Sequence, residues 1–334
     1  MPDPIVLADS TLSDAVTKFT NAFGTIAAFL AILLLIFLAA GRASGRIVKP
    51  LANAIFLGPA LLLLFVGLVI PAIRTAFLSF KNDDSSKFIG MKNYDWAFTT
   101  SAIQHVLLNT LLWIIIAPVL TTALGLGIAL LVDRMKRQAV YKSLIFMPMA
   151  ISFVGASIIW KFVYNSRDPS QPQIGLLSQV VIALGWKHPP NWILWQPFNT
   201  FLLMVILIWV QTGFAMVVLS AAIKAIPEEI LEAARMDGAT GAKQFFWVTI
   251  PMIRNTLVVV LTTVMITTLK IFDIIRTMTG GNFGTQVLAT EMYSQAFEQY
   301  NIGRGSALAV ILFLAVLPLV GYNIVQLRRE RSTR

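Results

Sequence analysis

The chain contains no cysteine and only two histidines, His105 and His188, among its 334 residues. Without cysteine it can form neither disulfide bonds nor thiolate metal sites, and it has no cysteine nucleophile. The two histidines lie far apart in the sequence and do not form a pattern of metal ligands. The sequence therefore predicts no metal site, no catalytic residue and no cofactor held by this chain.

Charged residues are scarce at 13%, whereas 57% of the residues are hydrophobic and the mean hydropathy is +0.76. This composition is too apolar for a soluble domain and indicates a polytopic membrane protein in contact with lipid. The net charge of +10 could suggest a nucleic-acid partner. The positions of the basic residues explain it better, so we expect no nucleic-acid binding.

Seven segments are apolar and long enough to cross a hydrocarbon core, which takes about 20 helical residues. They lie near residues 22–40, 51–73, 104–132, 141–164, 200–223, 252–275 and 303–327. Unpaired backbone groups are costly in lipid, and the segments lack the alternation of barrel strands. The predicted fold is an all-α integral membrane protein with about seven transmembrane helices.

Basic residues are unevenly divided between the two sides of these spans. One side carries 15 of the 26 lysines and arginines and the other carries nine. Positive charge marks the cytoplasmic side, which places residues 224–251 and the C-terminus inside and the N-terminus outside. Residues 1–18 carry three aspartates and one lysine, the reverse of the basic start of a signal peptide, so we expect the first span to be retained as an anchor.

The segment 165–199 is expected on the outer side. Residues 174–185 have an apolar helical pattern that ends in a glycine, and Trp192 and Trp195 follow it. Tryptophan is enriched at membrane interfaces, so we expect these two side chains to lie there.

The cytoplasmic loop has the pattern of two short helices. Pro227 can occupy the first helical position, with Glu228 and Glu229 behind it at the positive end of the helix dipole. Gly238 can adopt the left-handed conformation that ends a helix. A second helical stretch, 242–248, leads to Pro251, where a kink is expected. The loop should form a compact protrusion.

Composition alone leaves two interpretations of this protrusion: an amphipathic hairpin in the headgroup layer, or a docking element. The small side chains of Ala233 and Ala234, beside Glu232, would allow a partner to approach closely. Glu-Ala-Ala is followed after three residues by Gly238, and after nine more by aliphatic-x-aliphatic-Pro at 248–251. This spacing favours docking.

The spacing closely resembles the signature loop of permease subunits of binding-protein-dependent ABC importers. The resemblance extends from about residue 93 to the C-terminus and includes Lys-Ser-Leu-Ile-Phe-Met-Pro at 142–148, Lys-Ala-Ile-Pro at 224–227 and Thr-Gly-Gly at 279–281. Within that superfamily the chain is most similar to the maltose and alpha-glucoside permeases, of the larger subunit type with additional N-terminal spans.

The resemblance implies a type I importer core in the bacterial plasma membrane, which takes up di- or oligosaccharides such as maltose, trehalose or other alpha-glucosides. The implied partners are a second permease subunit, two cytoplasmic ATPase subunits and an extracytoplasmic sugar-binding protein. The chain has no Gly-x4-Gly-Lys-Ser/Thr loop, so ATP and magnesium should bind the ATPase partner. The implied ATPase-coupling residues are Glu232, Ala233, Ala234, Asp237, Gly238 and Pro251.

The predicted organisation has four parts. They are an N-terminal tail and additional anchor at 1–50, a first core span and outer loop at 51–103, a permease core at 104–327 with the coupling loop at 224–251, and a basic cytoplasmic tail at 328–334.

Polar and aromatic residues within the spans are candidates for sugar binding, because hydroxyls stripped of water need new partners. The resemblance places Trp209, Gln211 and Phe214 at sugar-lining positions. An equally open alternative is that Gln211 makes an interhelical hydrogen bond and that the two aromatic side chains only pack.

Four further residues complete the candidate sugar site. Thr268 matches a polar sugar-contacting position of the family, and Met149 and Ser152 are weaker candidates. Asp273 could pair with Lys270 on one helical face, although both could instead extend toward the nearby interface.

Three other functions compete with a sugar permease. The chain could be an ABC permease for a non-sugar solute. An ion-coupled secondary transporter would need membrane carboxylates, but Asp273 is the only acid in a predicted span and lies near its end. A scaffold or sensor could use the loop for signalling. A neighbouring gene for an ATPase or a sugar-binding protein would exclude the last two.

Overall fold

The computed structural model describes residues 17–21, 23–25, 27, 31, 34, 57–168 and 170–332, with the backbone alone at 324 and 326–332. The chain divides into two compact units, Met1–Arg74 and Thr75–Arg334. The predicted first span, 22–40, lies largely outside the described residues. Within the described part, the only strand-like pairing is a single bridge between Lys81 and Phe88. The predicted all-α fold is confirmed.

Five helices of the described part are long and apolar enough to cross a membrane, and one bent pair could form a sixth span. The five are Leu57–Leu78, which includes η1 (Phe65–Val69) and α3 (Ile70–Leu78), then α5 (Ser101–Val132), α9 (Phe198–Lys224), Ala242–Leu269, and Ile302–Asn323 within α15 (Ile302–Ser332). They correspond to predicted spans 51–73, 104–132, 200–223, 252–275 and 303–327.

The predicted span 141–164 is wrong as a single helix. Its first half is α6 (Gln138–Phe146) followed by the 3₁₀ turn η2 (Met147–Ala150), and its second half is α7 (Phe153–Val163). The two halves differ in direction by 102°. Ser152 has an extended backbone, and its hydroxyl accepts a hydrogen bond from the Gly155 N–H at 3.1 Å, which starts a new helix.

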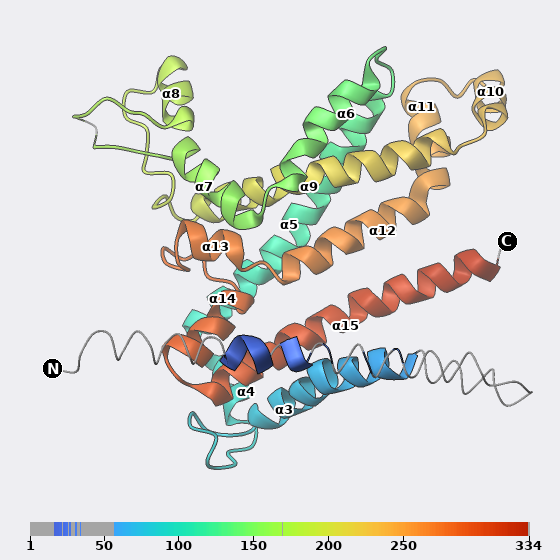
Figure 1. The fold of residues 1–334 in the computed structure, drawn as a ribbon. Helices are drawn as coiled ribbons and strands as arrows, with labels where there is room; N and C mark the ends of the chain where they lie inside the picture. The colour runs from blue at the N-terminus through green and yellow to red at the C-terminus, as the bar shows by residue number, and fades with distance from the viewer. Residues whose placement is uncertain are drawn as a thin grey trace, which may run out of the picture. The chain divides into compact units, whose positions relative to one another are not determined.

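The predicted span 252–275 also differs from the structure at both ends. Its helix begins upstream, with α11 (Ala242–Gln244) and the π-helical turn η3 (Phe245–Thr249), and continues into α12 (Ile250–Leu269). The ribbon changes direction between α11 and α12, as expected near Pro251 (Figure 1). The helix ends at Leu269, and a separate short helix, α13 (Asp273–Met278), follows.

Helix α9 is the centre of the second unit and packs against α5, α6, α7 and α12. Of its most apolar window 61% is buried, compared with 33% for α5. A Cβ atom on Gly213 would lie 2.6 Å from the Ile145 carbonyl oxygen, and one on Gly125 would lie 2.5 Å from the Ala215 Cβ atom. These glycines bring α6 and α5 into close contact with α9, as small residues do in membranes.

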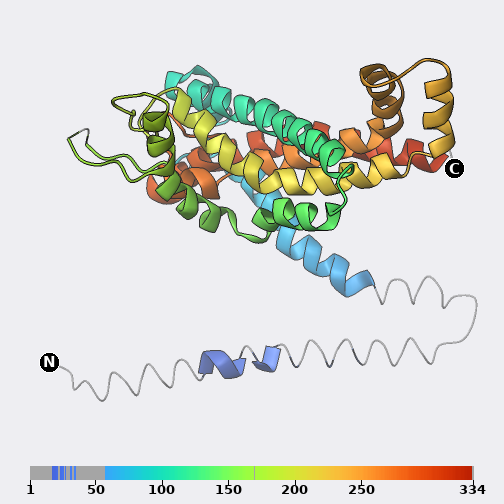
Figure 2. The same ribbon diagram turned by 90° about the horizontal axis from the view of Figure 1, so that it is seen from above.

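Short helices lie at the two ends of this bundle. The coupling loop contains α10 (Glu228–Met236), and α10 and α11 project from the end at which α15 also terminates (Figure 1). The opposite end carries α8 (Leu176–Ala183), as Figure 2 also shows. The same end of the bundle carries α4 (Lys92–Thr99), α13, α14 (Leu288–Tyr293) and η4 (Ser294–Glu298).

Helix α8 confirms the helical pattern predicted at 174–185, and Gly185 follows it with a φ of +100°. Trp192 does not lie at a lipid interface, because it is only 4% exposed and its indole N–H donates to the Ser178 hydroxyl at 2.8 Å. It packs the following loop onto α8.

Candidate functional site

The predicted coupling loop is an ordered helical hairpin. Pro227 precedes α10 as its N-cap and does not occupy the first helical position, which Glu228 takes. Glu228 and Glu229 lie in the first turn and Arg235 lies in the last, an arrangement that matches the helix dipole. The side chain of Gln244 in α11 donates to the Leu231 carbonyl at 3.1 Å and ties the two helices together.

Gly238 ends α10 through a Schellman motif. Its φ is +79°, its N–H donates to the Arg235 carbonyl at 3.0 Å, and the Ala239 N–H donates to the Ala234 carbonyl at 2.9 Å. A Cβ atom at this position would meet nothing within 4 Å. The backbone conformation therefore explains the signature glycine, since the surrounding space does not require it.

The other predicted coupling residues lie on or beside the same protrusion. On α10 and at its end, Glu232, Ala233 and Asp237 are exposed and Ala234 is half-buried. Pro251 is also exposed and lies at the start of α12. The adjacent Met236 is 89% exposed.

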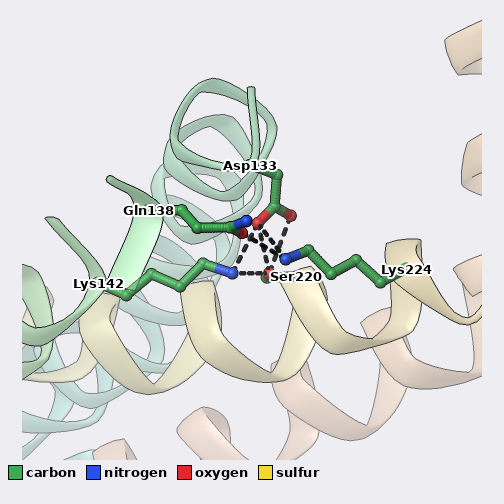
Figure 3. Close-up of polar contacts among 5 residues, drawn as sticks. All are labelled: Asp133, Gln138, Lys142, Ser220 and Lys224. Carbon is green, nitrogen blue, oxygen red and sulfur yellow. Dashed lines mark hydrogen bonds and ion pairs between the residues drawn. The ribbon is translucent and has the colours of Figure 1, made fainter. Parts of the chain in front are cut away.

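Asp133 forms a polar cluster that the sequence analysis did not predict (Figure 3). Its carboxylate lies 2.6 Å from the Lys142 ammonium nitrogen and 3.4 Å from that of Lys224, and it accepts a hydrogen bond from the Ser220 hydroxyl at 2.8 Å. Lys224 also donates to the Gln138 side chain. The sequence feature that could have indicated this cluster is Asp133 itself, a single acid between the predicted span 104–132 and a run of basic residues.

The charge environment of Asp133 keeps it ionised. Burial raises the pKa of this carboxyl, but hydrogen bonds from Lys142 and Ser220, with the charges of Lys142 and Lys224, outweigh burial and hold the pKa below its usual value. The carboxylate is therefore available as an ion-pair partner for both lysines at neutral pH.

A cavity of about 450 Å³ opens between α5, α6, α7 and α9. It is lined by Leu124, Ile128, Leu144, Ile145, Pro148, Trp160, Val205, Ile208, Trp209 and Thr212. Of the predicted sugar-binding residues only Trp209 lines this cavity. The α9 members follow the spacing of one helical face, a signal that the sequence analysis did not use.

The other aromatic and amide candidates of α9 point elsewhere. Gln211 is two residues from Trp209, about 200° around the helix. Phe214 packs against the buried cluster formed by Ala215 and Leu219 of α9 and Val260 of α12. The structure thus separates these two residues from Trp209, and their contact with sugar stays a prediction.

Thr268 and Asp273 lie on different helices. Thr268 is 1% exposed, and its hydroxyl donates to the Val264 carbonyl at 2.8 Å within α12. Asp273 is exposed at the start of α13. Lys270 is the C-cap of α12 and Asp273 is the first residue of α13, so of the two alternatives the pairing on one helical face is wrong.

Met149 and Ser152 lie at the bend between α6 and α7. Met149 is exposed in η2, and the exposed Ser152 caps α7 with its hydroxyl. Neither residue lines the cavity. Their role in sugar binding also stays a prediction.

Comparison with known proteins identifies the family. A family model described as "Binding-protein-dependent transport system inner membrane component" matches residues 121–332. The chain is 48% identical to the osmoprotective compounds uptake permease protein GgtC of Synechocystis, over 84% of this chain and 100% of that protein. It is 46% identical to the alpha-glucoside transport system permease protein AglF of Rhizobium meliloti, over 85% of each.

The fold is also found in a solved structure. One chain of a bacterial ABC transporter involved in import of the acidic polysaccharide alginate matches with a TM-score of 0.71 and 19% identity, over 85% of this chain and 99% of that one. The chain belongs to the membrane-integral family of inner-membrane components of binding-protein-dependent transport systems.

Proposed function

We propose that this chain is the transmembrane permease subunit of an ATP-driven importer of di- and oligosaccharides, with alpha-glucosides as its substrate class. The observation that carries the proposal is the 46% identity, over 85% of the chain, with a permease named for alpha-glucoside transport. A trehalose/maltose permease of Thermococcus litoralis, 30% identical over 83% of the chain, points to the same class of sugar.

The importer would contain this chain, a second permease subunit, two cytoplasmic ATPase subunits and an extracytoplasmic sugar-binding protein. ATP and magnesium would bind the ATPases, because this chain has no phosphate-binding loop. A solved alginate transporter of similar fold was obtained in complex with a periplasmic protein bound to an alginate pentasaccharide. That assembly is a precedent for the delivery of sugar by a soluble protein.

The ATPase would bind the exposed face of α10. Glu232, Ala233 and Asp237 would contact it, Gly238 would hold the end of the helix in shape, and Pro251 would direct the chain back into the membrane. ATP binding can shift the permease between its inward-facing and outward-facing states only if this docking differs in free energy between them. Coupling therefore requires that a movement of α10 also moves the helices around the solute pathway.

Sugar would pass beside the cavity that Trp209 lines. Its volume of about 450 Å³ falls within the range of pockets for small molecules. Trp160 and Thr212 add an aromatic ring and a hydroxyl to the same wall. The remaining predicted contacts, namely Gln211, Phe214, Thr268, Asp273, Met149 and Ser152, would have to face the pathway from other helix faces, where the second permease subunit could complete the site.

We propose the plasma membrane of a bacterium as the location, with the N-terminus outside and the C-terminus inside. The charge bias of the connections supports this orientation. The shared position of α10, α11 and the end of α15 agrees with a common cytoplasmic side (Figure 1). The proposed parts remain the anchor at 1–50, the first core span and outer loop at 51–103, the permease core at 104–327 and the tail at 328–334.

Solute-stimulated ATP hydrolysis tests the function. The complex would be reconstituted in vesicles with its ATPase and binding protein, and ATP turnover would be measured with trehalose, maltose or glycerol 3-phosphate. We expect the two alpha-glucosides to stimulate turnover. Stimulation by glycerol 3-phosphate alone would favour a non-sugar permease, and sugar uptake driven by an ion gradient without ATP would contradict the proposal.

A further inference from the structure

Asp133, Gln138, Lys142, Ser220 and Lys224 form a cluster, here called the polar clasp, at the end of the bundle from which α10 projects (Figures 1 and 3). Three elements meet in it. Asp133 follows the last residue of α5, Gln138 and Lys142 belong to α6, and Ser220 and Lys224 belong to α9.

Helical spacing explains why two residues of each helix take part. Gln138 and Lys142 are four residues apart, as are Ser220 and Lys224, so each pair lies on one helical face. The Asp133 carboxylate lies between these faces. It pairs with Lys142 at 2.6 Å and with Lys224 at 3.4 Å. One acidic side chain thus bridges α6 and α9.

The clasp depends on this single negative charge. Its two ammonium groups and one carboxylate leave a net charge of +1, and the Asp133 side chain is 13% exposed. Without the carboxylate, two ammonium groups would face each other in a partly buried place and repel. The neutral amide of asparagine would preserve the shape of the side chain but not this compensation.

The clasp also joins the coupling loop to the cavity. Lys224 is the last residue of α9, and Pro227, three residues later, is the N-cap of α10. On the other side of the clasp, α6 leads into η2, where Pro148 lines the cavity. Only three residues therefore separate α10 from the clasp, and α6 connects the clasp to the cavity wall.

A second contact joins α6 to α9. Seven residues before Ser220, Gly213 of α9 lies against the Ile145 carbonyl of α6. The structure thus holds α6 against α9 at two points, one steric and one ionic.

We propose that Asp133 is a positioning residue for transport: it holds α6 on the loop end of α9, so that movement of α10 reaches the cavity wall. The inference rests on the proposed function and adds a residue outside the signature loop and outside the solute cavity. Asp133 touches neither the solute nor the ATPase in this role.

Two sets of substitutions test the role in the reconstituted complex, with trehalose as the probe. Asp133→Asn removes the compensating charge. The double substitution Ser220→Ala with Lys224→Gln removes the contacts from α9 but leaves the pair between Asp133 and Lys142 intact. Glu298→Gln is the matched control, since Glu298 forms an exposed ion pair with Arg276 at 2.6 Å near the opposite end.

The measured quantities are ATPase co-purification, ATP turnover with and without trehalose, and uptake per ATP hydrolysed. We expect both clasp variants to retain the ATPase but to lose about tenfold in trehalose stimulation and in uptake per ATP, within the usual range of coupling between sites. Glu298→Gln should behave like the wild type.

Normal stimulation and uptake in the double variant would overturn the inference, because α9 would then not need the clasp. A loss of stability without a change in uptake per ATP would show a structural role only. If the wild-type complex shows no turnover stimulated by trehalose or by maltose, the proposed function fails, and the inference about Asp133 is not the cause. The absence of cysteine also allows the distance between α6 and α9 to be followed with introduced cysteine labels.

Discussion

Gly238 and Gly213 are both required by the structure, but for different physical reasons. Gly238 has a φ of +79° and open space around it, so the backbone conformation selects glycine. Gly213 lies inside a helix, and the nearby Ile145 carbonyl selects it because a Cβ atom would come within 2.6 Å. The signature pattern predicted the first glycine, whereas only the packing revealed the second.

Substitution of Gly238 should separate backbone strain from side-chain bulk. We expect Gly238→Ala to destabilise the end of α10 by about 1–2 kcal/mol, the cost of a left-handed conformation with a Cβ atom. Gly238→Asn should be milder, because asparagine tolerates this conformation. ATPase co-purification and uptake measure the effect. Equal behaviour of Gly238→Ala and the wild type would contradict the C-cap argument.

Trp209 should matter more for solute recognition than Gln211, because only Trp209 lines the cavity. We expect Trp209→Ala to raise the trehalose concentration needed for half-maximal ATP turnover by about tenfold, a loss of about 1.4 kcal/mol. Trp209→Phe, which keeps an aromatic ring, should lose less. A larger effect of Gln211→Ala than of Trp209→Ala would place the pathway on the other face of α9.

At the scale of elements, the interruptions of helices were harder to predict than the helices. The apolar runs predicted the spans around α5 and α9 closely, because length and hydropathy act locally. The 102° bend between the halves of the predicted span 141–164 depends on Ser152 as a helix cap and on packing against α9. Both apolar halves give the same hydropathy signal with or without a bend.

The contact between α6 and α9 gives a prediction at this scale. Gly213→Ala should force the two helices apart and destabilise the bundle by about 1–3 kcal/mol, as overpacking does. Gly127→Ala is the matched control, because a Cβ atom at Gly127 of α5 would meet nothing within 4 Å. Thermal unfolding of the detergent-solubilised complex would measure both. Equal melting temperatures would refute the proposed close contact.

At the scale of the whole second unit, the loop with α10 and the segment with α8 occupy opposite ends of the long helices (Figures 1 and 2). Segments that lie on opposite sides of a membrane must be separated in this way. The charge bias of the connections is the basis for our proposal that the basic end lies in the cytoplasm. The arrangement agrees with an ATPase partner at one end and a sugar-binding protein at the other.

Reporter fusions test this orientation. A fluorescent protein fused after Arg334 should fluoresce, because the predicted C-terminus is cytoplasmic. An alkaline phosphatase inserted between Gly185 and Trp186, after α8, should be active because that end is predicted to be outside. Reversed activities of the two reporters would show that the chain is inserted the other way.

The membrane class, most spans, the charge bias and the helical pattern of the loop at 224–251 could be predicted from the sequence, because they depend on composition and on residues close together in the chain. Helix packing was needed to show which face of α9 lines the cavity, since Trp209 and Gln211 look equivalent in sequence. It also showed that Asp133 meets Ser220 and Lys224, about ninety residues away. Such contacts arise when helices pack, and no local pattern encodes them.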